Sequence, residues 1–172
     1  MKRQQSYVEG IIGFCTAPYC AFRGGEICRR LIIGFGLGVY FLPILTAGEG
    51  LDEAALASLQ TSIELSGTFQ RGLPGSDAFH WGESTIMVSR DRIWLDGVIT
   101  PGPDYRLYLT PAFADDEASF LAIKDRAVQI AEIKAFTNFN VMVPAHVDVS
   151  AFPAVLIWCE AFGELITAAE LS

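Results

Sequence analysis

The stretch Ala154-Val155-Leu156-Ile157-Trp158-Cys159 decides the fold of the larger part of this chain. Six consecutive apolar residues, several of them β-branched or aromatic, are typical of a strand that is buried on both faces. The run ends at Cys159, which is the only cysteine after Cys28. A single cysteine cannot form a disulfide within this part of the chain. Cys159 is therefore an inert packed thiol, a redox group or a ligand.

Short runs of the same kind recur before and after this stretch, separated by clusters of Gly, Pro and Asp. We expect strands at residues 63–70, 84–89, 92–98, 106–110, 128–133, 140–143, 155–160 and 165–170. This spacing predicts an all-β domain over residues 63–171, an antiparallel β-sandwich of about eight strands. Residues 111–126 are expected to form a long loop with one helical turn, in which the acidic residues 115–117 are solvated charges.

The excess of apolar residues lies near the N-terminus. Residues 31–48 contain no charge, and a helix of that length spans about 27 Å, close to the ~30 Å hydrocarbon core of a bilayer. Arg29 and Arg30 precede the segment, and acidic residues follow it at 49, 52 and 53. Because basic flanks stay in the cytoplasm, we expect a single-pass signal anchor at 31–48 with the N-terminus inside. A cleaved signal peptide is the alternative.

These features predict four parts. Residues 1–30 form an N-terminal cytoplasmic tail, 31–48 the transmembrane or signal-anchor segment, and 49–62 a linker with a short helix. Residues 63–171 form a β domain that is exported to the periplasm or the cell exterior. Cys15, Cys20 and Cys28 then face a reducing compartment, but their spacing assigns them no role.

The charge of the exported part excludes one class of partner. Residues 1–30 hold five basic and two acidic residues, and the remainder holds 7 basic and 18 acidic residues, a net charge of −11. A nucleic-acid-binding face needs basic residues to meet the phosphates. We therefore expect no nucleic-acid partner, and a membrane partner only through residues 31–48.

No metal or hydrolase signature is present in the exported part. His80, His146 and Cys159 with a methionine would supply the residue types of a blue-copper site. The residues after Cys159 contain neither His nor Met, so the usual loop of such sites is missing, and Met87 and Met142 are expected in the core. There is also no G-x-S-x-G motif. We expect no metal site.

Three segments together resemble one family. They are Phe69 with Asp77-Ala78-Phe79-His80-Trp81-Gly82, then Ile93-Trp94-Leu95-Asp96 with Gly102-Pro103-Asp104-Tyr105-Arg106-Leu107-Tyr108-Leu109, then the stretch ending in Ile157-Trp158-Cys159 with Phe162. This pattern resembles the DM-thirteen electron-transfer domain, of which bacteria have membrane-tethered versions. The segment from Gly38 to Ala47 is similar to the leader of those bacterial members. The resemblance covers roughly residues 63–171.

The resemblance implies a redox role for Cys159, either as a free thiol or as an axial ligand of haem, together with a redox partner protein. His80 matches a histidine or polar position of the family and is the candidate second ligand. Lys134-Ala135 departs from the family, which has Lys-Gly at this turn, so the backbone there must differ. An apolar setting beside Glu160 and Glu164 raises the pKa of a thiol. The alternative is therefore a non-catalytic envelope or adhesion module with a structural, buried cysteine.

Overall fold

The computed structural model describes residues 18–172, with side chains from residue 25 onward. Cys15 lies outside the described residues, and of Cys20 only the backbone is described. The chain divides into two compact units, residues 1–41 and 42–172. The long helix α2, Pro18–Leu45, starts in the first unit and ends in the second. It therefore begins well before the apolar run and ends before residue 48.

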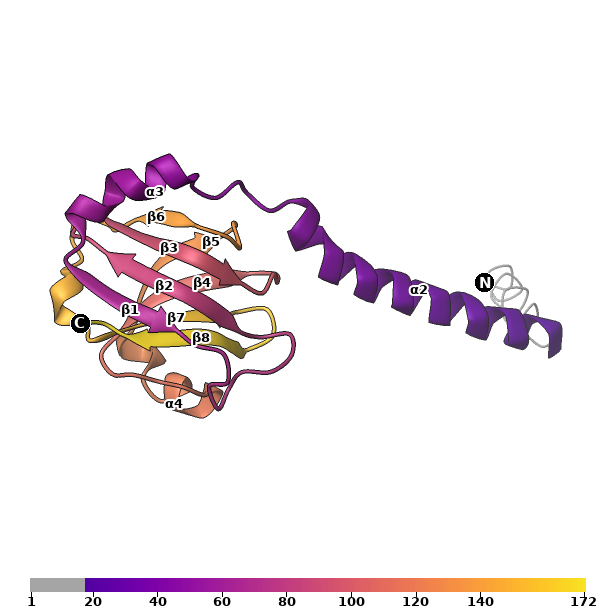
Figure 1. Ribbon diagram of the computed structural model, residues 1–172. Helices are drawn as coiled ribbons and strands as arrows, with labels where there is room; N and C mark the ends of the chain where they lie inside the picture. Colours follow the sequence, from indigo (N-terminus) through magenta and orange to yellow (C-terminus); the bar gives the residue numbers. More distant parts are fainter. Residues whose placement is uncertain (1–17) are drawn as a thin grey trace, which may run out of the picture. The chain divides into compact units, whose positions relative to one another are not determined.

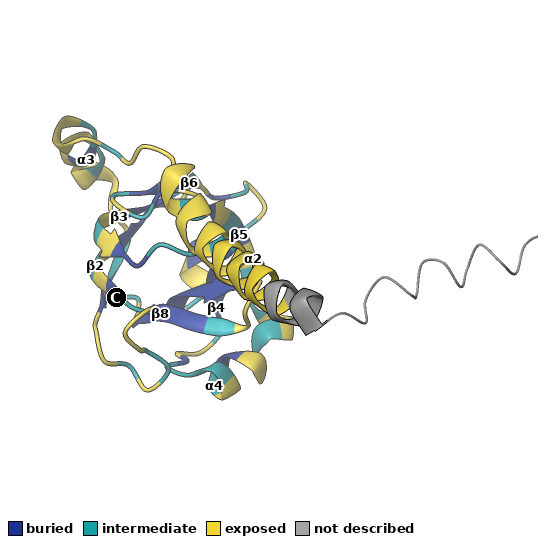
Figure 2. Cartoon of the chain, turned by 90° about the vertical axis from the view of Figure 1, so that its right-hand side faces the viewer, coloured by how far each residue is buried: buried dark blue, intermediate teal, exposed yellow. Residues whose placement is uncertain are grey.

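Within α2, the segment Gly25–Leu45 is long and apolar enough to cross a membrane, and none of it is buried by the protein (Figure 2). Its 21 residues correspond to about 31 Å of helix. Pro43 lies in the last turn and cannot donate a backbone hydrogen bond. The helix ends there, and both the amide and the hydroxyl of Thr46 bind the carbonyl of Leu42.

The second unit contains two antiparallel four-stranded sheets, as the sequence predicts (Figure 1). The first sheet has the order β1-β2-β3-β6 and the second β5-β4-β7-β8. The strands are β1 Leu65–Phe69, β2 Gly82–Val88, β3 Arg92–Ile99, β4 Tyr105–Thr110, β5 Val128–Ile133, β6 Asn140–Met142, β7 Ala154–Cys159 and β8 Glu164–Glu170. Each overlaps one of the eight predicted segments.

The strand β7 lies between β4 and β8, and all six of its residues are buried. Its side chains alternate between two apolar clusters. Val155, Ile157 and Cys159 belong to the core between the sheets, whereas Leu156 and Trp158 belong to a cluster on the outer face. A strand with apolar partners on both faces needs the continuous apolar run from which this domain was predicted.

Short helices cover the outer faces of both sheets. On the second sheet, Phe120 of α4 (Glu117–Leu121) packs with Tyr108 and Trp158. On the first, Leu56 of α3 (Glu53–Leu59) packs with Met87 and Trp94. The remaining helical turns are η2 Gln60–Ser62, η3 Lys124–Arg126 and η4 Val149–Ala151. The predicted linker helix and the turn near residue 118 are both present.

Two details correct the sequence interpretation. Asp116 is not only a solvated charge, because it caps the N-terminus of α4. Its carboxylate accepts a hydrogen bond from the amide of Ser119, and the Ser119 hydroxyl accepts one from the amide of Asp116 at 3.2 Å. Met142 is not in the core, since 57% of its surface is exposed, while Met87 is buried. The three-residue strand β6 lies at the edge of its sheet, where side chains lack neighbours on one side.

The linker after α2 is bound along the β5–β6 connection. The amide of Gly48 donates a hydrogen bond to the carbonyl of Lys134, and the amide of Leu51 donates one to the carbonyl of Asn138, both at 2.8 Å. Asn138 has φ of 47°, a conformation that asparagine tolerates, and its side chain binds Gly97 and Leu51. The left-handed backbone in this connection is therefore at Asn138, and Ala135 is not among the residues with positive φ.

Candidate functional site

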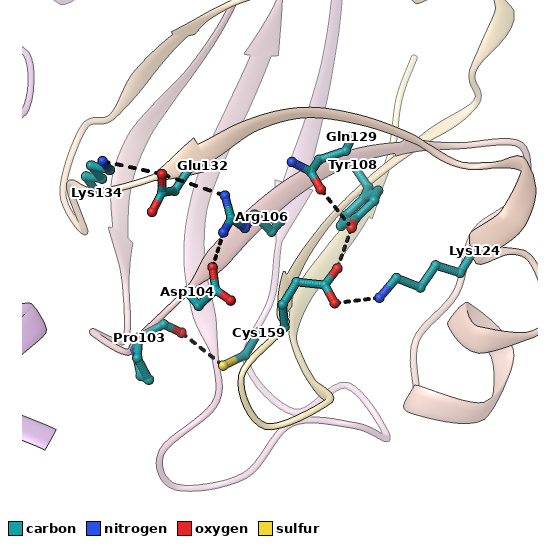
Figure 3. Close-up of polar contacts among 10 residues, drawn as sticks. Pro103, Asp104, Arg106, Tyr108, Lys124, Gln129, Glu132, Lys134 and Cys159 are labelled. Atoms are coloured by element: carbon teal, nitrogen blue, oxygen red, sulfur yellow. Dashed lines mark hydrogen bonds and ion pairs between the residues drawn. The ribbon is translucent and has the colours of Figure 1, made fainter. Parts of the chain in front are cut away.

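Cys159 is fully buried at one end of the sandwich. It pairs with Tyr105 of β4 and with Glu164 of β8. Its thiol donates to the carbonyl of Pro103 at 3.1 Å, in the turn that joins β3 to β4 (Figure 3). The last residue of β7 is thereby fixed to a turn 56 residues away. Among the described residues Cys159 forms no disulfide, and its side chain has no solvent-exposed surface.

The environment of Cys159 raises the pKa of its thiol above the ordinary value. Burial is the largest cause, because it disfavours the charged thiolate. The carboxylates of Asp104 and Glu164 add to this effect, and the backbone amides of Phe162 and Ala161 oppose it. At neutral pH the thiol is protonated and donates to Pro103, so it is a poor nucleophile while the domain stays closed.

The turn over Cys159 has a constrained backbone. A Cβ on Gly102 would lie 2.3 Å from the hydroxyl oxygen of Tyr105, so only glycine fits there. Asp104 has φ of 54°. The carboxylate of Asp104 accepts a hydrogen bond from the guanidinium of Arg106. The Cys159 thiol therefore lies under a turn that is held by both an aromatic ring and an ion pair.

That ion pair is one end of a charge network on the outer face of β4 and β5. Arg106 also contacts Glu132 at 3.6 Å, and Glu132 contacts Lys134 at 3.3 Å (Figure 3). The side chain of Arg106 is 25% exposed, while Lys134 is 72% exposed. The network is thus anchored near Cys159 and reaches solvent at its other end.

A second polar network begins one residue after the thiol. Glu160 accepts hydrogen bonds from the Tyr108 hydroxyl and, at 2.7 Å, from the ammonium group of Lys124. The Tyr108 hydroxyl also lies 3.2 Å from Gln129. The Lys124 ammonium lies over the rings of Tyr108, Phe120 and Trp158, at 5.3–5.9 Å from their centroids.

The pKa values in this network move in opposite directions. Burial opposes ionisation of Glu160, but the hydrogen bonds from Lys124 and Tyr108 outweigh it and hold the pKa of Glu160 below its ordinary value. Burial and the bond to Glu160 raise the pKa of Tyr108. Glu160 is therefore a carboxylate and Tyr108 a neutral donor at neutral pH. Contrary to the sequence interpretation, Glu160 is directed away from Cys159 and toward this network.

His80 lies in the loop between β1 and β2, with a side chain that is 23% exposed. Its Nδ1 atom is 3.0 Å from Asp77, whose carboxylate also accepts from the amides of Phe79 and His80. These amides, that of Phe79 first, lower the pKa of Asp77. In the part of the chain that the structure describes, no group of three metal-ligating side chains occurs. His80 is bound to Asp77, whereas the Cys159 thiol is bound to Pro103.

The packing around Cys159 does not fit haem. An axial thiolate needs an open face beside the sulfur, but this sulfur is fully buried against Pro103 and the core. A cavity of about 310 Å³ is lined by the turn 102–104 and by residues 132–134, among others, and Cys159 does not line it. Cys159 is therefore not positioned to hold haem in this packing.

Sequence reasoning missed both polar networks. Arg106 and Tyr108 lie two residues apart in β4 and share one face of the strand, and Asp104 directly precedes the strand. This period of two was visible in the sequence. Their partners Glu132, Lys124 and Glu160 come from other segments, and only the sheet pairing brings them together.

Comparison with known proteins identifies one family. No curated protein and no solved structure matches the chain. Residues 68–171 match the family described as Electron transfer DM13, which covers more than half of the sequence and all eight strands except the first three residues of β1. The chain therefore belongs to the DM13 electron-transfer domain family.

Proposed function

We propose that this protein is a membrane-tethered redox accessory module whose electron-transfer centre is Cys159. The observation that carries the proposal is the location of the thiol: the one cysteine of the family domain ends the central buried strand, under a glycine-dependent turn. A group held in this way by a rigid scaffold is set apart from bulk solvent, which suits a centre that must react with one partner only.

The chemistry of a lone thiol limits the partner. Within residues 42–172 no second cysteine is available to form a disulfide. The reaction that balances is exchange with a partner disulfide. The Cys159 sulfur would bond to one partner sulfur as the partner's S–S bond breaks, and the displaced partner thiolate would take up the proton that Cys159 loses. Because the thiol is buried, the turn 102–104 or the turn 160–163 must open first.

The tether is supported by α2. The segment Gly25–Leu45 is exposed along its length, basic residues lie at its N-terminal side and acidic residues follow it. In the proposed topology the N-terminus is cytoplasmic and the β domain is exported. A reporter that is active only in the cytoplasm, fused after Ser172, tests this: we expect no activity, and strong activity would reverse the orientation.

A structural role for Cys159 is the second candidate, in a module for the cell envelope or adhesion. One observation favours it: the thiol is completely buried, protonated and hydrogen-bonded to Pro103, as expected of an inert core cysteine. Both candidates predict the same fold, so only the reactivity of the thiol distinguishes them.

The deciding experiment measures that reactivity in the folded protein. Cys15, Cys20 and Cys28 are changed to Ser in the full chain, so that Cys159 is the one remaining thiol. The detergent-solubilised protein is mixed with an aromatic disulfide reagent, and release of the aromatic thiol is followed with and without denaturant. A variant with Cys159→Ala in addition is the blank.

If Cys159 is the redox centre, the folded protein reacts at a rate above that of global unfolding, because one turn opens locally. If the reaction proceeds only at the rate of unfolding, measured on the same sample by tryptophan fluorescence, the thiol is structural and the redox proposal is wrong.

A further inference from the structure

One end of the sandwich carries Cys159, and we call it the thiol end. In the second sheet, Tyr105 at the start of β4 pairs with both Cys159, the last residue of β7, and Ile133, the last residue of β5. In the first sheet, Gly82 at the start of β2 pairs with Ile99 at the end of β3. The connections at this end are residues 70–81, 100–104, 134–139 and 160–163. Met142 of β6 pairs with Arg92, the first residue of β3, and so lies at the opposite end.

The linker from α2 enters the domain at the thiol end. Helix α2 ends at Leu45, and the amide of Gly48 binds Lys134, the first residue after β5. Three extended residues reach at most about 11 Å. Wherever the helix points, the thiol end therefore stays within a short distance of the last helical residue.

The thiol end also exposes aromatic side chains. In the β domain, the two most exposed large hydrophobic residues are Phe79, at 65%, and Phe162, at 58%. Phe79 lies in the β1–β2 connection, near Trp81, whose backbone binds Thr100 just after β3. Phe162 lies in the β7–β8 turn, three residues after Cys159. Two connections far apart in sequence thus present a phenylalanine at the same end.

The basic side chains at this end are already paired with acids. Arg71 contacts Glu83 at 3.0 Å, and its guanidinium lies over the ring of Trp81. Arg106 and Lys134 both contact Glu132. Few free cations remain for anionic headgroups, so contact with lipid here would rest on burial of the phenylalanines rather than on charge.

We propose that the thiol end rests on the exported surface of the bilayer, with Phe79 and Phe162 inserted among the headgroups. This inference rests on the proposed membrane tether. The short linker and both exposed phenylalanine rings lie at the same end of the domain. As a consequence, the turns that cover Cys159 lie at the membrane surface, and a redox partner reaches the thiol from the membrane plane.

The test uses the full chain, with its four cysteines removed, in nanodiscs of phosphatidylcholine. A nitroxide label is attached at Phe162→Cys, at Phe79→Cys in a second variant, and at Met142→Cys as the control. Met142 is 57% exposed, which matches Phe162, but lies at the other end. Collisions with oxygen, which concentrates in lipid, are compared with collisions with a water-soluble nickel complex.

We expect labels at 162 and 79 to favour oxygen and to be shielded from nickel at least several-fold relative to the label at 142. Equal access of nickel to all three labels would overturn the inference. Co-elution of protein with nanodiscs reports the tether separately: if the chain does not co-elute, the proposed anchor fails, whereas co-elution with equal nickel access refutes only the orientation.

Discussion

The ion pair between Lys124 and Glu160 supports one prediction in detail. It joins the η3 turn to the residue after β7, with 2.7 Å between the ammonium nitrogen and the carboxylate oxygen. The two side chains are 30% and 29% exposed, so the pair is intermediate between a surface and a buried ion pair. The perturbation is a double-mutant cycle of Glu160→Gln and Lys124→Met, which removes each charge and keeps most of each side chain.

The magnitude follows from this environment. A hydrogen bond to a charged group contributes about 1.5–3 kcal/mol when buried, and exposed pairs contribute about 0.2–1 kcal/mol. With nearly a third of each side chain in solvent, we expect Glu160→Gln to lower the free energy of unfolding by about 1–2 kcal/mol. Glutamine can still accept from Tyr108, and Lys124 keeps its aromatic neighbours. We therefore expect a coupling energy of about 1 kcal/mol between the two sites.

The assay is urea unfolding of the full chain in detergent, followed by tryptophan fluorescence at pH 7 and at several acidic pH values. The folded pKa of Glu160 lies below its ordinary value of 4.5. The stability that Glu160 contributes is therefore present above pH 4.5 and is lost as the pH falls through the folded pKa. The difference between wild type and Glu160→Gln should shrink over that range.

Glu164→Gln is the control, because this carboxylate lies in the same hairpin and has no ion pair among the described residues. It should change the free energy of unfolding by less than about 0.5 kcal/mol. A coupling energy below about 0.3 kcal/mol, or a Glu160→Gln effect that is constant down to acidic pH, would show that solvent screens the pair. The network would then not hold the η3 turn against β7.

Three further predictions concern the thiol, the linker and the histidine. Cys159→Ala should lower the free energy of unfolding by about 1–2 kcal/mol, since it removes a fully buried sulfur; a neutral result in denaturant unfolding would contradict the packing. Gly50→Ala should detach the linker from the β5–β6 connection and speed its proteolysis, because a Cβ there would lie 2.0 Å from the Thr137 carbonyl oxygen. Gly48→Ala is the control: its Cβ meets only ordinary contacts, so its proteolysis rate should match that of the wild type. His80→Ala should cost less than about 1 kcal/mol, because its partner Asp77 is 57% exposed and keeps its bonds to backbone amides; a larger loss in thermal unfolding would assign His80 a structural role.

The local elements of this protein were predictable because they depend on short-range patterns. The continuous apolar run of β7, buried on both faces, and the glycine and proline clusters between runs located the eight strands. The burial and the raised pKa of Cys159 followed from the same run. These features depend on side-chain type and on the two-residue period of a strand. Both can be read directly from the sequence.

Only the tertiary structure decided which segments meet. The order β5-β4-β7-β8 places β4 beside β7, and this brings Pro103 to Cys159 and Tyr108 to Glu160 across more than 50 residues. The side chain of Asn138 binds the linker at Leu51, a contact between segments 87 residues apart. Strands that are distant in sequence could pair in many orders, and their local strand propensities do not distinguish these orders. Packing of the whole core selects one of them. The sequence by itself determined the strands and the buried thiol, and the sheet order determined what surrounds that thiol.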